Sequence, residues 1–415
     1  MRFIHASDLH LDSPLRGLDR YDGAPVTRLR TATRAALERL VDRALDEPVD
    51  FLLLAGDIYD RDWQDFHTGL FFREQMVRLN RAGIRVFIVQ GNHDAQGVIS
   101  RQLPLPGNVH LFSSRAAETR RIDGLAVAIH GRSFPNRAVE EDFVPSYPEP
   151  VPGFFNIGLL HTSLNGRPGH DTYAPTDLLK LKAKGYDYWA LGHIHAREVL
   201  SEQPRIVFSG NLQGRHANET GAKGCDIVTV DAGRIETEFL ALDVVRWSHI
   251  HVCLDGIEGL ESVNAAFRAA LAPALAGAED RLHAVRVTLT GTTILHRLEA
   301  EQPGSLAATV QAAAQDVGEV EIWVEQVRTN LSPPLDRGQS AQRQDAVGEL
   351  IRLVDGIALD EESMRRFVQS VIGGLLSAMP SEVSADEIPK LDNPAELRAL
   401  LLDAEATVLA RLAGG

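Results

Sequence analysis

Residues 50–57 read D-F-L-L-L-A-G-D, a short apolar run that stops at a glycine and an aspartate. Such a run is typical of a strand that is buried on both faces of a parallel sheet. Residues 85–92, R-V-F-I-V-Q-G-N, repeat the pattern, and residues 2–8, R-F-I-H-A-S-D, also end at an aspartate. The sequence therefore predicts three strands, each followed by a polar residue.

Helical patterns separate these strands. Residues 26–46 place apolar side chains at helical spacing with arginines on the other face, and a second helix is expected near 65–82. Strands that alternate with helices predict an α/β layer. Ligands of such layers usually bind at the carboxyl ends of the strands, which is where the polar residues lie.

The rest of the chain changes character twice. From about 105 to 245, short strands alternate with Pro- and Gly-rich turns. A smaller α/β unit is expected next, with strands near 248–254, 283–289 and 320–327 and helices near 259–276 and 304–316. A polar segment then leads into a helical tail, where Asn393 and Pro394 are typical of a helix start. We therefore expect three regions, at 1–245, 246–335 and 336–415.

Length and composition indicate a globular chain with more than one domain. Its 415 residues are 44% hydrophobic and 24% charged. The two cysteines, Cys225 and Cys253, do not support a disulfide framework, so a reducing cytoplasm is expected. No apolar run approaches the ~20 residues that cross a bilayer, and no signal-peptide pattern is visible. We expect no membrane partner.

The net charge of −15 at first argues against a nucleic-acid partner. Its distribution weakens that argument, because residues 1–245 carry a net charge of −4 and residues 246–415 carry −11. Two bound divalent cations would bring the first part close to neutrality. Overall charge therefore does not decide the class of substrate.

Five short motifs carry the candidate chemistry. Each follows an apolar run, and they contain Asp8 and His10; Asp57; Asn92, His93 and Asp94; His161; and His193 and His195. Taken singly they are weak, because Asp-x-His occurs by chance, Gly-Asp is usually a turn, and a lone histidine at a strand end is commonly just a tolerated polar residue. Their joint placement at strand ends makes coincidence improbable.

The residue types suit a pair of metal ions. Mixed oxygen and imidazole ligands favour Mn²⁺, Fe²⁺ or Zn²⁺ over Ca²⁺. Two ions about 3.5–4 Å apart need a bridging carboxylate, for which Asp57 is the candidate. Asp8, His10 and one of the last two histidines would serve one ion, and Asn92, His161 and the other histidine the second. Residues two apart in extended chain point the same way about 6.5–7 Å apart, so His193 and His195 should bind different ions.

These motifs, in this order and spacing, resemble the calcineurin-like metallophosphoesterase superfamily. Within it, M-R-F-I-H-A-S-D-L-H-L-D-S-P-L, G-D-I-Y-D, Q-G-N-H-D, A-L-G-H-I-H and S-G-N-L-Q-G-R-H resemble the bacterial SbcD-like DNA repair exonuclease subunits, especially the YhaO-type branch, over residues 1 to about 240. The resemblance implies a four-layer α/β/β/α sandwich, which here would carry a small α/β capping domain and a helical C-terminal tail. It also implies two Mn²⁺ ions, cleavage of DNA phosphodiesters and an SMC-type coiled-coil ATPase partner.

Carried over to this chain, the resemblance implies a role for each motif residue. The first metal would be bound by Asp8, His10, Asp57 and His195, and the second by Asp57, Asn92, His161 and His193. His93 is similar to the family's catalytic histidine, and Asp94 would orient its ring. The two cations would polarise the phosphate and make hydroxide available from a bridging water, while His93 would protonate the leaving alkoxide or stabilise charge.

The chain departs from the family at three positions. Some relatives carry a histidine, linked to exonuclease activity, where this chain has Asp60, which we interpret as a helix-start carboxylate or an outer partner of the site. Leu9 and Asp12 replace a tryptophan and a glycine of SbcD proper. These departures bear on exonuclease specificity and leave the metal motifs intact.

Further side chains are weaker candidates for substrate contacts. Arg215 could pair with a phosphate, and His216 and His170 could touch substrate, although exposed loop side chains of these types are commonplace. Aromatic side chains near the second motif could stack on a base, although core packing is more common for such residues; they are Tyr59, Trp63 and Phe66.

Three classes of function remain open. The first is a Mn²⁺-dependent DNA exonuclease or endonuclease subunit that acts in DNA repair with an ATPase, and whose oligomeric state, a homodimer included, is open. The second is a phosphoesterase for nucleotides or other small phosphodiesters, which would need appended domains less. The third is a non-enzymatic scaffold, which the complete set of motifs disfavours. The C-terminal helices would either dock a partner or form a self-contained cap.

Overall fold

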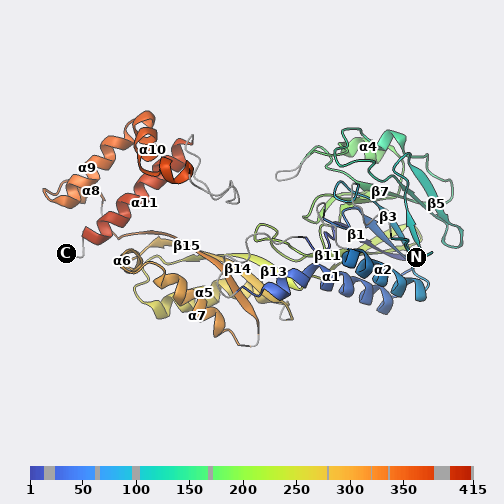
Figure 1. Cartoon of the computed structure of the whole chain (residues 1–415), viewed down its shortest axis with the longest axis horizontal. Helices are drawn as coiled ribbons and strands as arrows, with labels where there is room; N and C mark the ends of the chain where they lie inside the picture. The colour runs from blue at the N-terminus through green and yellow to red at the C-terminus, as the bar shows by residue number, and fades with distance from the viewer. Residues whose placement is uncertain are drawn as a thin grey trace. The chain divides into compact units, whose positions relative to one another are not determined.

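The structure is a computed structural model that describes most of the chain (Figure 1). The described residues are 1–13, 24–60, 66–95, 103–166, 172–277, 280–318, 320–334, 337–377 and 393–412. They form two compact units. The first holds the described residues up to Trp247 together with Asp280–Leu282, and the second holds the other described residues from Ser248 onward.

The first sheet of the first unit has the three predicted strands at its centre. In spatial order it consists of β12 (Arg234–Ala241), β11 (Gly224–Asp231), β1 (Arg2–Ala6), β2 (Phe51–Ala55), β3 (Arg85–Val89) and β4 (Val109–Leu111). β1, β2 and β3 are parallel neighbours, and β11 runs antiparallel to β1. The carboxyl ends of the three central strands therefore meet at one end of the sheet.

The second sheet of this unit is also six-stranded. Its order is β5 (Glu118–Ile122), β6 (Val127–Gly131), β7 (Phe155–His161), β8 (Tyr188–Gly192), β10 (Arg205–Phe208) and β9 (Glu198–Glu202). β6, β7, β8 and β10 are parallel, and β5 and β9 are antiparallel to their neighbours. Two parallel strands, β7 and β8, thus bring their carboxyl ends together as in the first sheet.

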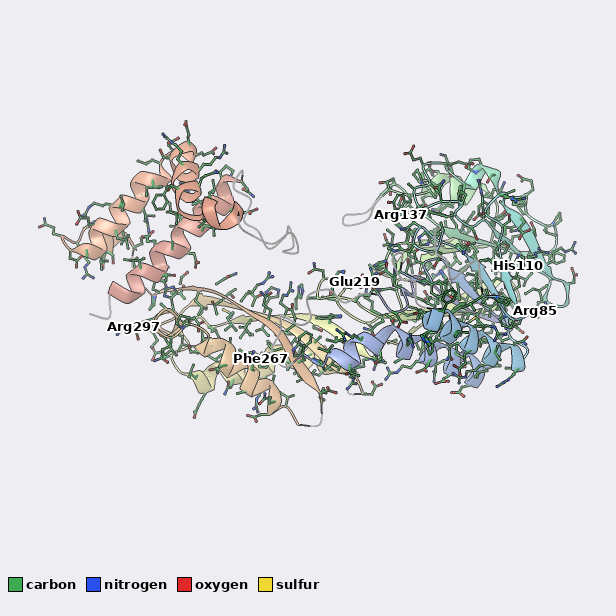
Figure 2. The ribbon with its side chains drawn as sticks, viewed as in Figure 1. Arg85, His110, Arg137, Glu219, Phe267 and Arg297 are labelled. Carbon is green, nitrogen blue, oxygen red and sulfur yellow. The ribbon has the colours of Figure 1, made fainter. Side chains whose placement is uncertain are left out.

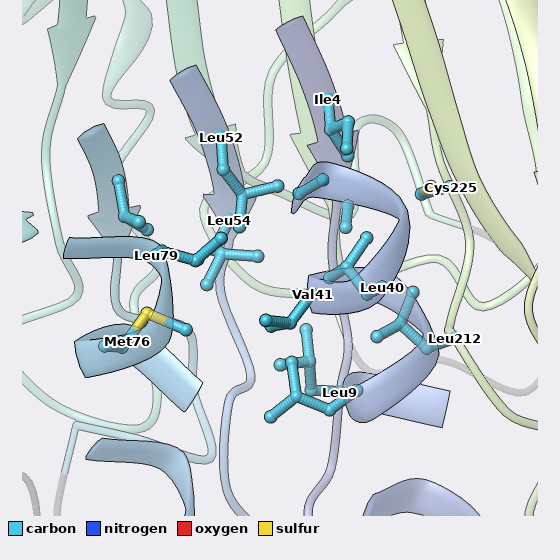
Figure 3. Close-up of a cluster of buried hydrophobic side chains, with 14 of the residues drawn as sticks. Ile4, Leu9, Leu40, Val41, Leu52, Leu54, Met76, Leu79, Leu212 and Cys225 are labelled. Carbon is cyan, nitrogen blue, oxygen red and sulfur yellow. The ribbon is translucent and has the colours of Figure 1, made fainter. Parts of the chain in front are cut away.

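Alternation along β2 explains how the layers form. Leu52 and Leu54 pack with α1 (Val26–Asp46) and α2 (Phe66–Arg81) on one face of the first sheet (Figure 3). Phe51 and its alternate neighbours on β2 point the other way, into a core shared with the second sheet. Because both faces are covered, the whole strand is apolar.

A third core lies on the outer face of the second sheet. There Trp189 packs with Leu181 of α4 (Leu178–Ala183) and with Phe143 beside the 3₁₀ helix η3 (Val144–Ser146). Helices, sheet, sheet and helices follow one another in the first unit. The predicted four-layer α/β/β/α architecture is confirmed.

The second unit begins with a small α/β domain. Its sheet has the order β13 (Val245–Cys253), β14 (Leu282–Thr292) and β15 (Ile322–Ser332), and β14 is parallel to β15. The helices are α5 (Leu260–Leu275), α6 (Leu295–Glu301) and α7 (Ser305–Gln315). Phe267 of α5 is fully buried in the core between helices and sheet (Figure 2). The predicted strands and both predicted helices are observed, while α6 was not expected.

The helical tail consists of α8 (Arg337–Ala341), α9 (Ala346–Ala358), α10 (Glu361–Ser377) and α11 (Pro394–Leu412). The predicted helix start is confirmed, because the side-chain oxygen of Asn393 accepts the N–H of Ala395 at 3.0 Å. Arg337 pairs at 3.1 Å with Glu405, whose side chain is buried. None of the described helices is long and apolar enough to cross a membrane. The exact boundaries at 245 and 335 stay a prediction.

Candidate metal centre

The seven predicted ligands lie together at the strand ends of the first unit. Asp8 and His10 follow β1, Asp57 follows β2, and Asn92 follows β3. The second sheet contributes the other three, with His161 at the last position of β7 and His193 and His195 after β8. Six of the seven side chains are buried, and His195 is 14% exposed. The site is therefore built where five parallel strands of two packed sheets end.

The loops after β1 and β2 run side by side and turn in the same way. The N–H of Asp8 donates to the carbonyl of Gly56, and the N–H of His10 donates to the carbonyl of Asp57, each at 3.0 Å. Positive φ angles occur at four predicted ligands, namely Asp8 (51°), His10 (42°), Asp57 (51°) and His193 (102°). Such angles are uncommon for residues other than glycine and cluster at functional sites. The backbone thus bends so that these side chains face inward.

One group of donors consists of Asp8, His10 and His195. The Nε2 atoms of the two histidines are 3.1 Å apart, and Nε2 of His195 is 3.8 Å from Oδ1 of Asp8. Two atoms that each lie about 2.0–2.2 Å from one ion are separated by roughly 3 Å or more. The spacing of these donors therefore fits a shared cation.

A second group consists of Asp57, His161 and His193, with Asn92 beside it. Nδ1 of His161 donates to the carbonyl of Ala55 at 2.8 Å, so Nε2 presents a lone pair in the neutral ring. That lone pair faces Oδ1 of Asn92, another acceptor, at 3.0 Å. Two acceptors in such contact fit a cation that both would bind.

Asp57 lies between the two groups. Its Oδ2 atom is 3.7 Å from Nε2 of His10 and 3.5 Å from Nε2 of His161. Burial raises the pKa of Asp57 well above its usual value, and burial also lowers the pKa of His10 well below its own. A neutral imidazole is the form that binds a metal. The donor set therefore fits the predicted dinuclear centre with Asp57 as the bridge, while the binding of metal itself stays a prediction.

Two glycines that precede predicted ligands in the sequence leave space for the ligand side chains. A Cβ on Gly91 would lie 2.2 Å from Oδ1 of Asp57 and 2.7 Å from Cε1 of His161. Gly56, with φ of 95°, would place a Cβ 2.4 Å from Nδ1 of His161. These two positions need glycine because the ligand side chains pass directly over the backbone.

Comparison with known proteins identifies the fold that carries this centre. Residues 1–197 match the family described as calcineurin-like phosphoesterase, and residues 247–332 match that described as metallophosphoesterase YhaO, middle domain. Residues 1–197 therefore form a calcineurin-like metallophosphoesterase domain. The second match agrees with the YhaO branch to which the sequence motifs point.

Two curated relatives of this metallophosphoesterase are informative. It is 41% identical over 251 residues to an uncharacterized metallophosphoesterase YhaO of Bacillus subtilis, covering 60% of this chain and 62% of that protein. It is 27% identical over 279 residues to the DNA double-strand break repair protein Mre11 of Methanopyrus kandleri, covering 60% of this chain and 58% of that protein. The chain thus spans about six tenths of each relative. Among solved structures, a dimetal phosphatase from Danio rerio matches with a TM-score of 0.38 and 12% identity, over 58% of this chain and 96% of that one.

The predicted catalytic histidine of the metallophosphoesterase stands beside the donors. His93 is 17% exposed, and its Nε2 is 4.0 Å from Oδ2 of Asp57. Its Nδ1 is 2.9 Å from Oδ1 of Asp60, to which it donates. Burial lowers the pKa of His93, but the hydrogen bond to Asp60 and the charge of Asp57 outweigh burial and raise that pKa above its usual value.

This contact corrects the role predicted for Asp94. Its carboxylate accepts the backbone N–H groups of Ile58 at 3.2 Å, Tyr59 at 3.0 Å and Gly91 at 3.1 Å. Asp94 therefore ties the loops after β2 and β3 together, and Asp60 holds the ring of His93. Sequence adjacency was misleading because the side chain of Asp94 turns toward the backbone. Asp60 is an outer partner of the site, as one reading of the sequence expected.

Arg215 lies at the centre but is held by carboxylates. Its guanidinium is 3.6 Å from Oδ2 of Asp60 and 3.2 Å from Oε1 of Glu219. His216, whose side chain is 57% exposed, is 3.6 Å from the same oxygen of Glu219. Both side chains therefore lie near the metal-donor groups. A substrate contact by Arg215 or His216 stays a prediction, because nothing in the structure tests it.

Other predicted or missed residues are also placed. Tyr59 packs at 5.7 Å against Phe72 in the core, and Phe66 is 43% exposed. Trp63 and His170 lie outside the described residues. No role was predicted for Glu219, which is 2.6 Å from Nδ1 of His195. The signal available for it was its place at the start of the segment E-T-G-A-K-G, shortly after the motif S-G-N-L-Q-G-R-H.

Proposed function

We propose that this metallophosphoesterase is a Mn²⁺-dependent DNA nuclease subunit acting in DNA repair. The observation that carries the proposal is the pair of donor groups with Asp57 between them and the partly exposed His93 at their side. Mn²⁺ suits a mixed carboxylate, amide and imidazole set, and Fe²⁺ or Zn²⁺ would suit it as well. Cations bound there would supply positive charge to the phosphoryl oxygens and lower the pKa of water.

The side chains around the centre have separate tasks in this proposal. Asp8, His10, Asp57 and His195 would hold one cation, and Asp57, Asn92, His161 and His193 would hold the other. His93 would keep a proton on Nδ1, where Asp60 accepts it, and would offer Nε2–H to the leaving oxygen. Such proton transfer contributes typically 10²–10⁴-fold to a rate. Asp94 keeps the two loops that carry Asp57 and His93 in register.

The choice of DNA over small phosphodiesters rests on relatives and on domain content. One distant relative is named as a DNA double-strand break repair protein. The chain also carries a second unit with a small α/β domain and a helical tail, which a small-molecule hydrolase has less need of. The same donor set would serve a phosphoesterase for nucleotides, and that activity is the alternative.

Digestion of DNA beside a small substrate separates these functions. End-labelled single- and double-stranded DNA and a chromogenic phosphodiester would be incubated with the purified chain and Mn²⁺, with EDTA as the blank. Cleavage of labelled DNA that needs Mn²⁺ supports the nuclease. Cleavage of the chromogenic substrate alone would leave only the small-substrate hydrolase. Shortening from the labelled ends and internal cuts would distinguish exonuclease from endonuclease activity.

The proposed function also includes a partner protein that binds the helical tail. A coiled-coil ATPase of the SMC type would dock on the helical tail, which exposes apolar side chains on α9 and α10, among them Leu353 (60%), Phe367 (42%) and Val371 (65%). Co-purification of the full chain with such an ATPase, compared with a chain carrying Leu353→Glu and Val371→Glu, tests the contact. Loss of binding by the double variant supports docking on the tail, and unchanged binding places it elsewhere. Elution volume at two concentrations tests for a homodimer.

A further inference from the structure

Glu219 is a buried carboxylate next to one of the candidate metal ligands. It lies in the segment between β10 and β11, and its position is labelled in Figure 2. Only 8% of its surface is exposed, and Oε1 is 2.6 Å from Nδ1 of His195. A carboxylate that is buried this deeply needs several partners to stay charged.

Its partners come from a short stretch of the same segment. Oε2 accepts the backbone N–H of Arg215 at 2.7 Å and the side-chain amide of Asn211 at 3.0 Å. Oε1 accepts the guanidinium of Arg215 at 3.2 Å. Burial would raise the pKa of Glu219, but the hydrogen bond from His195 and the charge of Arg215 outweigh burial and hold that pKa well below its usual range. Because both oxygens of Glu219 accept hydrogen bonds from N–H groups, Glu219 acts as a carboxylate.

The contact fixes the tautomer of His195. A carboxylate can only accept, so Nδ1 of His195 carries the hydrogen and Nε2 presents its lone pair. Nε2 points to the donor group, 3.1 Å from Nε2 of His10 and 3.8 Å from Oδ1 of Asp8. A carboxylate behind a metal-binding imidazole orients the ring and makes it more basic.

The other donor group is supported differently. His161 donates to a backbone carbonyl, that of Ala55, so no side-chain substitution at that partner can alter the contact. The oxygens of Glu219 contact His195 in the first group, and no hydrogen bond joins them to His161 or Asp57 among the described residues. Glu219 therefore places a charge that substitution can remove behind a histidine of the first group.

We propose that Glu219 is a positioning residue for His195 and sets the metal affinity of the Asp8–His10–His195 group alone. The proposal rests on the dinuclear centre of the proposed function. Removal of the charge should weaken one of two equivalents of metal by 10- to 100-fold and leave the other unchanged. A merely structural carboxylate would not act on one equivalent selectively.

Mn²⁺ titration of the metal-stripped full chain tests this. Free Mn²⁺ would be followed by electron paramagnetic resonance, and wild type is expected to bind two equivalents. Glu219→Gln keeps the size of the side chain and is expected to show one wild-type and one weakened equivalent. Glu219→Asp, which keeps the charge, should recover part of the lost affinity. Glu325→Gln is the matched control, because Glu325 is also 8% exposed and pairs with an arginine, Arg286, but lies in the second unit.

The outcomes are distinct. The role of Glu219 is overturned if Glu219→Gln binds both equivalents of Mn²⁺ as wild type does. It is also overturned if Glu219→Gln loses both equivalents alike while its thermal unfolding matches that of the Glu325→Gln control. If wild type binds fewer than two equivalents of Mn²⁺, the centre is not dinuclear, and both the proposed function and the role of Glu219 are overturned. Two equivalents with selective loss in Glu219→Gln, in a chain that cleaves no DNA, upholds the role of Glu219 and defeats the nuclease.

Discussion

Oδ1 of Asp60 lies 2.9 Å from Nδ1 of His93, and this contact orients a histidine that stands beside the donor groups without being a predicted metal ligand. The second oxygen of Asp60 accepts the hydroxyl of Ser13 at 2.6 Å and lies 3.6 Å from Arg215. Asp60 is thus fixed from three sides. It stands where some relatives have a histidine, so this chain uses a carboxylate there to hold the neighbouring ring.

Replacement of Asp60 by Asn should lower kcat and shift its pH dependence. The carboxylate raises the pKa of His93, so its loss lowers that pKa and deprotonates His93 at lower pH. If His93 acts as the acid, the alkaline limb of the kcat profile moves to lower pH. Mn²⁺ stoichiometry should stay at the wild-type value. A profile that keeps its alkaline limb would contradict the acid role.

His93→Ala should abolish most hydrolysis and leave metal binding intact. The ring lies at the side of the donor groups and is expected to contribute about 10²–10⁴-fold to the rate. The measurements are kcat on the DNA or chromogenic substrate and Mn²⁺ content of the same preparation. Wild-type activity in the variant would show that another group serves the leaving oxygen.

Gly91→Ala should damage the centre although it adds one methyl group. The new Cβ would lie 2.2 Å from Oδ1 of Asp57, and the overlap would cost about 1–3 kcal/mol of stability. We expect a lower unfolding temperature and weaker Mn²⁺ binding. Gly107→Ala is the control, because no atom lies within 4 Å of its added Cβ. Equal behaviour of both variants would mean that the loop after β3 adapts.

Metal binding should release protons and strengthen with pH. Burial raises the pKa of Asp57 well above its usual value in the metal-free chain, so a cation must displace its proton. Titration calorimetry with Mn²⁺ in two buffers of different ionisation enthalpy measures this release. Free Mn²⁺ at 100 times Kd should also stabilise the fold by about 2.7 kcal/mol for each ion bound. Identical heats in both buffers would show that Asp57 is already ionised.

Acid should destabilise the first unit through His5, which lies outside the donor set. Its Nε2–H donates to the carbonyl of Leu191 at 3.2 Å, and its Nδ1 accepts the hydroxyl of Tyr188 at 3.0 Å. Burial lowers the pKa of His5 from 6.5 to about 3. The unfolded chain therefore takes up a proton below pH 6.5 that the folded chain does not take up until about pH 3.

The contribution of His5 to the free energy of unfolding is thus fully present above about pH 6.5 and is lost as the pH falls toward 3. Between pH 7 and pH 5 this group costs about 2 kcal/mol in the free energy of unfolding. His5→Gln should reduce the loss between these two pH values by that amount, as measured by urea unfolding with EDTA present. The same loss in both chains would show that His5 titrates normally.

Strand ends could be predicted from sequence because their signal is local. The helix expected at 26–46 is observed at Val26–Asp46, and each apolar run that ends in Gly-Asp or Gly-Asn is a central strand. The short edge strand β5, with the sequence E-T-R-R-I, was not expected, because it is polar and mostly unburied. Edge strands of this kind lack the apolar pattern on which such prediction depends.

The side chains that hold the histidines of the site could not be predicted, because only the folded chain brings these distant residues into contact. Glu219 reaches His195 across 24 residues, and Asp60 reaches His93 across 33. Asp12 was noted as a departure from glycine, and the structure explains it. With φ of 55°, it accepts hydrogen bonds from Arg34 and Thr68 and so ties both helices to the loop after β1.

The antiparallel pairing of β1 with β11 sets Arg2 opposite Thr229 and His5 opposite Asp226. During synthesis, β1 and the ligands that follow it, Asp8 and His10, are therefore made more than two hundred residues before the neighbouring strand β11. At 5–20 residues per second this interval is roughly ten to forty seconds. A fragment that stops before β11 would therefore leave one edge of β1 open.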